Sequence, residues 1–241
     1  GAEGIAAVNI VAPIFMVATG IGLMFGIGSS VVASIRLSEN KVKAARIIMT
    51  QAFIVGLVLV GIICVGSMVF PRQVVHLLGC SPLLELKAVS YLLWLLPGLP
   101  FLFIECVGMM LIRLDGSPKY AMSVQIVAAV VNIVLDWYMV FPLDWGVMGA
   151  ALATSIACAT GGMMVLVYFL CFPNKLRFYP LKWSLTSLLL TLRNTGYMAR
   201  IGFATFLTEL AMSVMMLTGN YMFISLLGED GVAAFAIACY L

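Results

Sequence analysis

The chain has 241 residues, of which 63% are hydrophobic and 10% are charged, and its mean hydropathy is +1.15. These values exclude an ordinary soluble domain, in which about 25% of the residues are charged, and they indicate an all-α integral membrane protein. The formal net charge of +3 gives no indication of a nucleic-acid partner.

Apolar runs long enough to cross a bilayer follow one another along the chain. They predict six membrane-spanning helices and the beginning of a seventh, at about 5–36, 47–70, 88–112, 119–141, 147–172, 199–227 and from 232 onward. The first run is too long for one straight crossing, so Pro13 and the glycines after it predict a kinked or tilted helix. Pro97 and Pro100 are expected to loosen backbone hydrogen bonding in the third.

Lysine and arginine residues are distributed unevenly between the loops. If the first helix runs from outside to inside, one side of the membrane carries eleven of the 13. The opposite loops keep only Arg72 and Lys87. The positive-inside rule assigns the basic side to the cytoplasm, so we expect a multi-pass protein of a bacterial plasma membrane.

An internal repeat suggests how the spans are organised. Residues 1–12 are similar to residues 228–239, and a repeat carried by hydrophobic helices is typical of transporters that have two related lobes. The sequence therefore predicts a first transmembrane lobe over 1–172, a cytoplasmic linker over 173–198 and the beginning of a second lobe over 199–241.

The predicted linker contains four leucines at helical spacing within 181–194. They are mixed with polar and basic residues, and this pattern predicts a short amphipathic helix lying on the cytoplasmic membrane surface. The alternative is an ordinary surface loop. The leucines are Leu185, Leu188, Leu189 and Leu192.

Three carboxylates lie inside predicted spans: Glu105, Asp136 and Glu209. Each costs about 2.5–3.5 kcal/mol in the middle of a membrane. We therefore expect each to face a wet cavity, to have a partner or to stay protonated.

The six cysteines lack metal-ligand spacing, so we predict no cofactor and no metal beyond a coupling Na⁺.

Asp136 forms the most informative group. Asn132 lies four residues earlier on the same helical face, and Thr154 could add a hydroxyl from the next helix. Amide, carboxylate and hydroxyl oxygens suit a small cation, and the carboxylate could equally accept a proton. The alternative is that Asn132 and Asp136 only hydrogen-bond to neighbouring helices.

The other two carboxylates support separate hypotheses. Glu209 is a second candidate site for a cation, close to two threonines. Glu105 could belong to the Asp136 cluster or could bond to a neighbouring helix.

Two other classes of membrane protein are less well supported by the sequence. An intramembrane aspartyl protease would need Glu105 and Asp136 within hydrogen-bonding reach of each other. Nothing in the sequence requires this, so we do not expect an enzyme. A channel would need a pore-loop signature, which the sequence lacks.

An ordered set of motifs makes the chain resemble one family. These motifs are Arg113-Leu-Asp115-Gly116-Ser117-Pro118, Asn132-x-x-x-Asp136, Gly146-Val-x-Gly149-Ala150-Ala151-x-Ala153-Thr154, Pro13 with the glycines after it, and Glu209 with Asn220. In this order and spacing they resemble the multidrug and toxic compound extrusion (MATE) family over essentially the whole chain.

The resemblance implies a twelve-helix protein with two six-helix lobes. Residues 1–172 would then be a first lobe that lacks the family's first helix, which carries an acidic partner for Asp136. Asn132, Asp136 and Thr154 would form the first-lobe cation site, and Glu209 a second-lobe site. Gly202-Phe203-Ala204 stands where many members have proline after the glycine.

Members of this family look like antiporters that exchange Na⁺ or H⁺ for organic, often cationic, compounds by alternating access. We therefore expect multidrug efflux, with the lipid bilayer and small organic substrates as partners and with no obligate protein partner. The alternative is a lipid-linked saccharide flippase of the same fold. That cargo predicts a basic central cavity, whereas the spans contain buried acids and no buried Lys or Arg.

Overall fold

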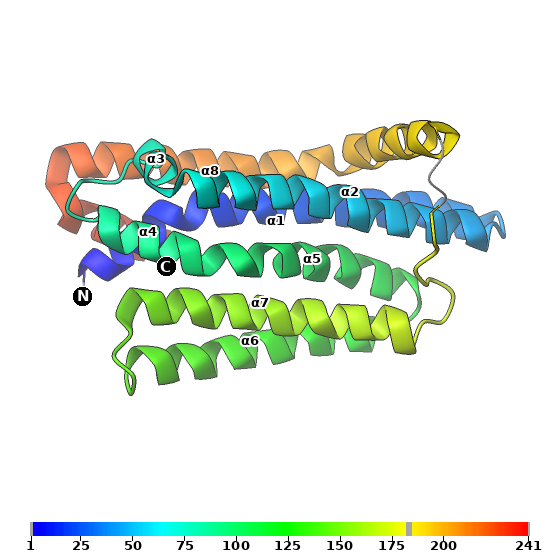
Figure 1. The fold of residues 1–241 in the computed structure, drawn as a ribbon, viewed down its shortest axis with the longest axis horizontal. Helices are drawn as coiled ribbons and strands as arrows, with labels where there is room; N and C mark the ends of the chain where they lie inside the picture. The colour runs from blue at the N-terminus through cyan, green and yellow to red at the C-terminus, as the bar shows by residue number, and fades with distance from the viewer. Residues whose placement is uncertain (1, 182–184, 241) are drawn as a thin grey trace.

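Long helices run side by side through most of the protein (Figure 1). The computed structural model describes residues 2–181 and 185–240. Within these ranges the elements are α1 (Ala2–Ser38), α2 (Val42–Val69), α3 (Pro71–Leu77), α4 (Glu85–Leu95), the 3-10 turn η1 (Leu96–Gly98), α5 (Leu99–Leu114), α6 (Pro118–Val140), α7 (Gly146–Cys171) and α8 (Leu185–Tyr240).

The predicted spans agree with these helices. In the described part of the chain, six segments are long and apolar enough to cross a membrane. They correspond to the first six predicted spans, and the all-helical fold class is confirmed. The start of the predicted seventh span, from 232 onward, is helical and belongs to α8 up to Tyr240.

The third span is interrupted, as its prolines predict. Helix α4 ends at Leu95, a single 3-10 turn follows, and α5 begins at Leu99. Pro97 and Pro100 have no N–H group, so the carbonyls one turn before them lose their helical donors. Helix α3, only seven residues long, was not predicted, because so short a polar and apolar mixture has no clear periodicity.

The two ends of the bundle carry different connections. The N-terminus, α3 and the turn between α6 and α7 lie at one end, and the linker lies at the other (Figure 1). An ion pair between Lys87 and Glu3 joins α4 to α1 at the first end, which we call the outer end. The loops with few basic residues lie at the outer end, and the loops rich in basic residues lie at the other end. The assignment of that other end to the cytoplasm stays a prediction.

Aromatic packing in the core depends on a glycine. Phe103 of α5 is fully buried and meets Phe25 of α1 edge to face, with 6.2 Å between ring centroids. A Cβ atom on Gly56 of α2 would lie 1.9 Å from Cζ of Phe103. Only glycine therefore lets α2 approach α5 closely enough to cover this ring.

Asp115, from the predicted turn between α5 and α6, holds the first part of the linker. Its side chain is buried, and Oδ1 accepts the backbone N–H groups of Lys175 (2.8 Å) and Leu176 (2.7 Å). Oδ2 accepts the N–H of Asn174 (2.8 Å) and the hydroxyl of Tyr168 (2.9 Å). The linker therefore starts as a docked segment, since three of these bonds join it to the turn after α5, and the fourth joins that turn to α7.

The second part of the predicted linker is also attached, in this case to helix α2. The Gln51 side chain of α2 is almost fully buried. Its Nε2 donates to Oγ1 of Thr191 (2.9 Å), and its Oε1 accepts from Nδ2 of Asn194 (2.8 Å). Both partners belong to the beginning of α8, so α2 binds the region predicted to be the amphipathic helix.

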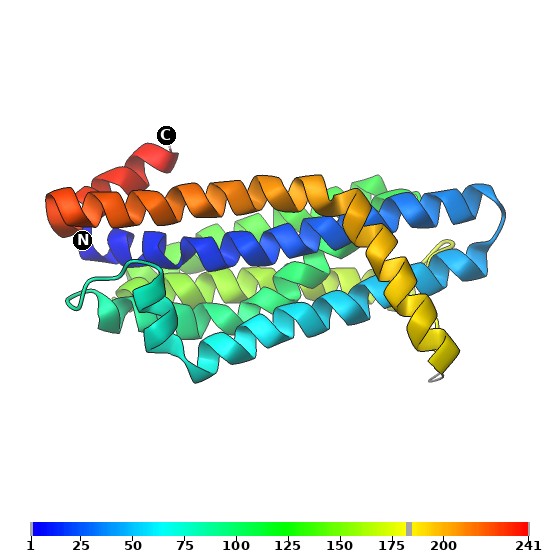
Figure 2. The same ribbon diagram turned by 90° about the horizontal axis from the view of Figure 1, so that it is seen from above.

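This amphipathic region differs from the prediction in its boundaries. Residues 182–184 of the predicted 181–194 helix lie outside the described residues, and from Leu185 the helix continues into the next span without a break in α8. Figure 2 shows α8 bending between its yellow and orange parts. The leucines at 188, 189 and 192 are exposed, and the position of this region on the membrane surface stays a prediction. The lobe boundaries themselves stay a prediction.

Candidate functional site

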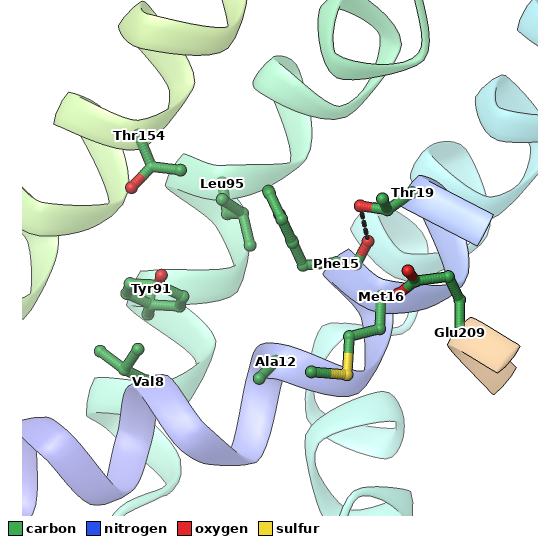
Figure 3. Close-up of a pocket in the computed structure, with 9 residues that line it drawn as sticks. All are labelled: Val8, Ala12, Phe15, Met16, Thr19, Tyr91, Leu95, Thr154 and Glu209. Carbon is green, nitrogen blue, oxygen red and sulfur yellow. Dashed lines mark hydrogen bonds between the residues drawn. The ribbon is translucent and has the colours of Figure 1, made fainter. Parts of the chain in front are cut away.

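Two of the predicted site residues line one cavity. This cavity has a volume of about 350 Å³ and lies among α1, α4, α7 and α8 (Figure 3). Its wall consists of Val8, Ala12, Phe15, Met16, Thr19, Tyr91, Leu95, Thr154 and Glu209.

Helix α1 supplies more than half of the wall. Its contributions recur every three or four residues, so they lie on one face of the helix. Most are apolar, and Phe15 with Tyr91 of α4 gives the cavity two aromatic side chains. The hydroxyl of Thr19 donates to the Phe15 carbonyl oxygen (2.9 Å), within its own helix.

Glu209 reaches the cavity from α8 because α1 has a glycine opposite it. A Cβ atom on Gly20 would lie 3.0 Å from Cβ of Glu209, so a larger residue would require Glu209 to shift by a few tenths of an ångström. Figure 3 shows the Glu209 carboxylate beside Met16 and Thr19. The side chain is half-buried. Among the side chains that the structure describes, neither a cation nor a hydrogen-bond donor pairs with this carboxylate.

Thr154 lies on the opposite side of the cavity from Glu209 in Figure 3. Its hydroxyl donates to the Ala150 carbonyl oxygen (3.0 Å) one turn earlier in α7, and its oxygen can still accept. The sequence grouped Thr154 with Asp136 and treated Glu209 as a separate site. The structure instead places Thr154 and Glu209 around one cavity, because α1 brings α7 and α8 to the same space.

Asp136 and Asn132 do not line this cavity. Both are half-buried and lie one turn apart on α6, as the spacing predicts. The Oδ1 atom of Asp136 is buried and lacks a hydrogen-bond partner in the described structure. Val140, a further turn along α6, lines a second cavity of about 290 Å³. Val8 belongs to the walls of both cavities, so the two adjoin there.

Glu105 lies elsewhere, between α5 and α7. Its side chain is 9% exposed, and a Cβ atom on Gly161 would lie 2.4 Å from its Oε2. The carboxyl group thus packs directly on the α7 backbone. Within the described ranges it makes no hydrogen bond or ion pair. It contacts a neighbouring helix and does not line the cavity that contains Glu209.

Sequence analysis missed one polar pair near these residues. Asn9 of α1 and Asn220 of α8 are 1% and 0% exposed, and Nδ2 of Asn9 donates to Oδ1 of Asn220 (2.9 Å). The signal was present, since a buried amide in an apolar span also costs free energy unless it is paired.

The cavity combines apolar and aromatic walls with one carboxyl group, that of Glu209. Such a surface can hold a hydrophobic molecule through its walls and a positive charge through the Glu209 carboxylate. A small cation or a proton would compete for the same carboxylate. Exchange between ligands of these two kinds is therefore chemically possible at one site.

Comparison with known proteins identifies the family and the fold of the chain. The MatE family model matches residues 1–138. The multidrug export protein MepA of Staphylococcus saprophyticus is 27% identical over 234 residues, which are 97% of this chain and 51% of MepA. The chain thus spans about half the length of this relative.

Two solved structures have the same fold. One is described as the inward-facing conformation of a multidrug resistance MATE family transporter of the MOP superfamily. It has a TM-score of 0.88 and 25% sequence identity, and the match covers 100% of this chain and 54% of that chain. The other is the MATE multidrug transporter DinF-BH, with a TM-score of 0.86, 30% identity and coverage of 99% and 52%. The family model matches more than half of the residues of the present chain. This chain therefore belongs to the MATE family.

Proposed function

We propose that the protein is a secondary active multidrug exporter that exchanges Na⁺ or H⁺ for organic, often cationic, compounds. The names of the relatives support export of small organic molecules. The membrane potential can drive such an exchange, because each charge that moves across gains about 2.3 kcal/mol per 100 mV. The expected setting is a bacterial plasma membrane.

One observation supports this function most strongly: the Glu209 carboxylate lies in an otherwise largely apolar cavity with aromatic walls. An organic cation would gain burial of its apolar surface and pairing of its charge. Na⁺ or H⁺ bound at Glu209 would remove the negative charge and weaken the binding of the organic cation. This competition couples the release of substrate to the entry of the ion.

Asp136 with Asn132 is proposed as the other ion-binding group. The buried Oδ1 atom without a hydrogen-bond donor supports this role, because an unpaired carboxylate oxygen at this depth favours a proton or a small cation. The hydroxyl oxygen of Thr154 could bind a cation or accept a hydrogen bond from a ligand in the cavity that Glu209 also lines. Glu105 remains a weaker candidate, since its carboxyl group packs on Gly161 and lies away from both Asp136 and Glu209.

Alternating access completes the proposal. Ion binding favours the conformation that opens outward and releases substrate, and the lobes then rock to face the cytoplasm. The lipid-linked saccharide flippase is less well supported. An anionic headgroup would need basic side chains, and the residues lining the described cavity include none.

The test is transport by the complete gene product in proteoliposomes. A Na⁺ or pH gradient is expected to drive uptake of a lipophilic organic cation, and Glu209→Gln is expected to reduce the rate at least tenfold. Glu39→Gln is the matched control, because Glu39 is an exposed carboxylate in the α1–α2 turn. Unchanged transport by Glu209→Gln would contradict the role of Glu209, and unchanged transport by Asp136→Asn would remove Asp136 from the mechanism.

A further inference from the structure

Helices α1 and α8 run antiparallel and in contact over much of their length (Figure 2). In the half nearer the linker, the contact depends on glycine. A Cβ atom on Gly28 would lie 2.1 Å from the Met198 carbonyl oxygen, and one on Gly202 would lie 2.1 Å from that of Met24. The two backbones therefore meet directly in this half.

In the outer half, hydrogen bonds join the same two helices at Pro13. Proline has no N–H group, so the carbonyl oxygen of Asn9, four residues earlier, has no donor within α1. Nδ2 of Asn220 donates to this oxygen (3.3 Å), while Nδ2 of Asn9 donates to Oδ1 of Asn220 (2.9 Å). Asn220 on α8 thus supplies the donor that α1 lacks.

Two further residues of α8 extend this contact. The hydroxyl of Ser213 donates to the Pro13 carbonyl oxygen (3.2 Å). At the outer end, the hydroxyl of Tyr221 donates to the carbonyl oxygens of His76 (3.3 Å) and Leu77 (2.9 Å) at the end of α3. Ser213 and Asn220 are seven residues apart, so they share one face of α8.

We propose that these residues form an outer latch, which we define as Asn9, Pro13, Ser213, Asn220 and Tyr221. The latch holds the outer half of α8 against the first lobe and breaks when the outer side opens. This inference rests on the alternating access proposed above. Oδ1 of Asn9 has no partner among the described residues even in this arrangement. Separation of the helices would in addition leave the Asn9 carbonyl oxygen and the Nδ2 groups of Asn9 and Asn220 without partners until water reached them, so the closed arrangement is favoured.

The test measures opening of the outer half directly. Met216, buried between Ser213 and Asn220 on α8, is replaced by cysteine in the complete gene product after its native cysteines have been replaced. A membrane-impermeant maleimide added from outside then labels Met216→Cys only when the helices separate. Asn220→Ala removes two hydrogen bonds, and we expect labelling to become about tenfold faster.

Two companion variants keep the test decisive. Tyr221→Phe removes only a hydroxyl from a side chain that is 48% exposed, so the protein should still fold, and we expect labelling about threefold faster. Thr218→Ala is the matched control on the same helix, because the Thr218 hydroxyl bonds only to the Val214 carbonyl of α8. Its labelling rate should equal that of the parent protein.

Organic-cation efflux is measured in the same vesicles. If the parent protein pumps and both Asn220→Ala and Tyr221→Phe are labelled no faster than Thr218→Ala, the latch is refuted while the transport function stands. If the parent protein does not pump at all, the proposed function fails, whereas faster labelling of the two variants would still support the hydrogen-bonded contact.

Discussion

Replacement of Asp115 by alanine should release the linker from the first lobe. The change removes the acceptor of three backbone N–H groups and one hydroxyl. Of the three residues that donate through the backbone, only Leu176 is buried, so its N–H would be left unpaired while the other two could reach water. One unpaired buried group and the lost bonds to a charged carboxylate together correspond to about 3 kcal/mol.

Limited proteolysis measures this release, because Lys175 and Arg177 place trypsin sites within the docked segment. If cleavage follows local opening, a loss of about 3 kcal/mol makes it up to about a hundredfold faster in Asp115→Ala. Glu39→Ala is the control, since its carboxylate forms only exposed ion pairs with Arg36 and Lys41, and it should leave the cleavage rate unchanged. Cleavage of Asp115→Ala within twofold of the wild-type rate would refute this role of the carboxylate.

Three further substitutions test packing through thermal unfolding of the purified protein. Gly161→Ala should lower stability by about 1–3 kcal/mol, because the added methyl group would meet the Glu105 carboxyl; an unchanged melting temperature would show that this contact is loose. Gly66→Ala should be neutral or stabilising by up to about 1 kcal/mol, since its Cβ would meet nothing within 4 Å in a helix interior, and a clear loss would contradict that open space. Gln51→Leu should cost about 1–3 kcal/mol because it leaves the Asn194 amide without its acceptor; equal stability would mean that water replaces Gln51.

Much of the fold could be predicted because the bilayer imposes a simple length and composition on each span. The break at Pro97 was predictable for a local reason, the missing N–H group. Docking of the linker was not, because Asp115 binds residues about 60 positions later. A motif shows that a turn exists, but it does not show which distant backbone the carboxylate will accept from.

The candidate site residues were predicted as one group of Asn132, Asp136 and Thr154 with Glu209 apart from it, whereas Thr154 lines the same cavity as Glu209. Helical spacing correctly placed Asn132 and Asp136 on one face of α6, since that relation is local. The shared cavity of Thr154 and Glu209 depends on how α1 packs between α7 and α8, which periodicity does not specify. Asn9 and Asn220 were missed as a pair for the same reason, although the missing donor at Pro13 indicated that a partner was needed.

The central claim is that the Glu209 carboxylate binds the positive charge of a transported compound within the apolar cavity. Equilibrium binding of a lipophilic organic cation and of a neutral molecule of the same shape to the purified complete gene product tests it most directly. We predict that Glu209→Gln weakens binding of the cation at least tenfold and leaves binding of the neutral molecule unchanged. Equal losses for both molecules, or no loss for the cation, would contradict the claim.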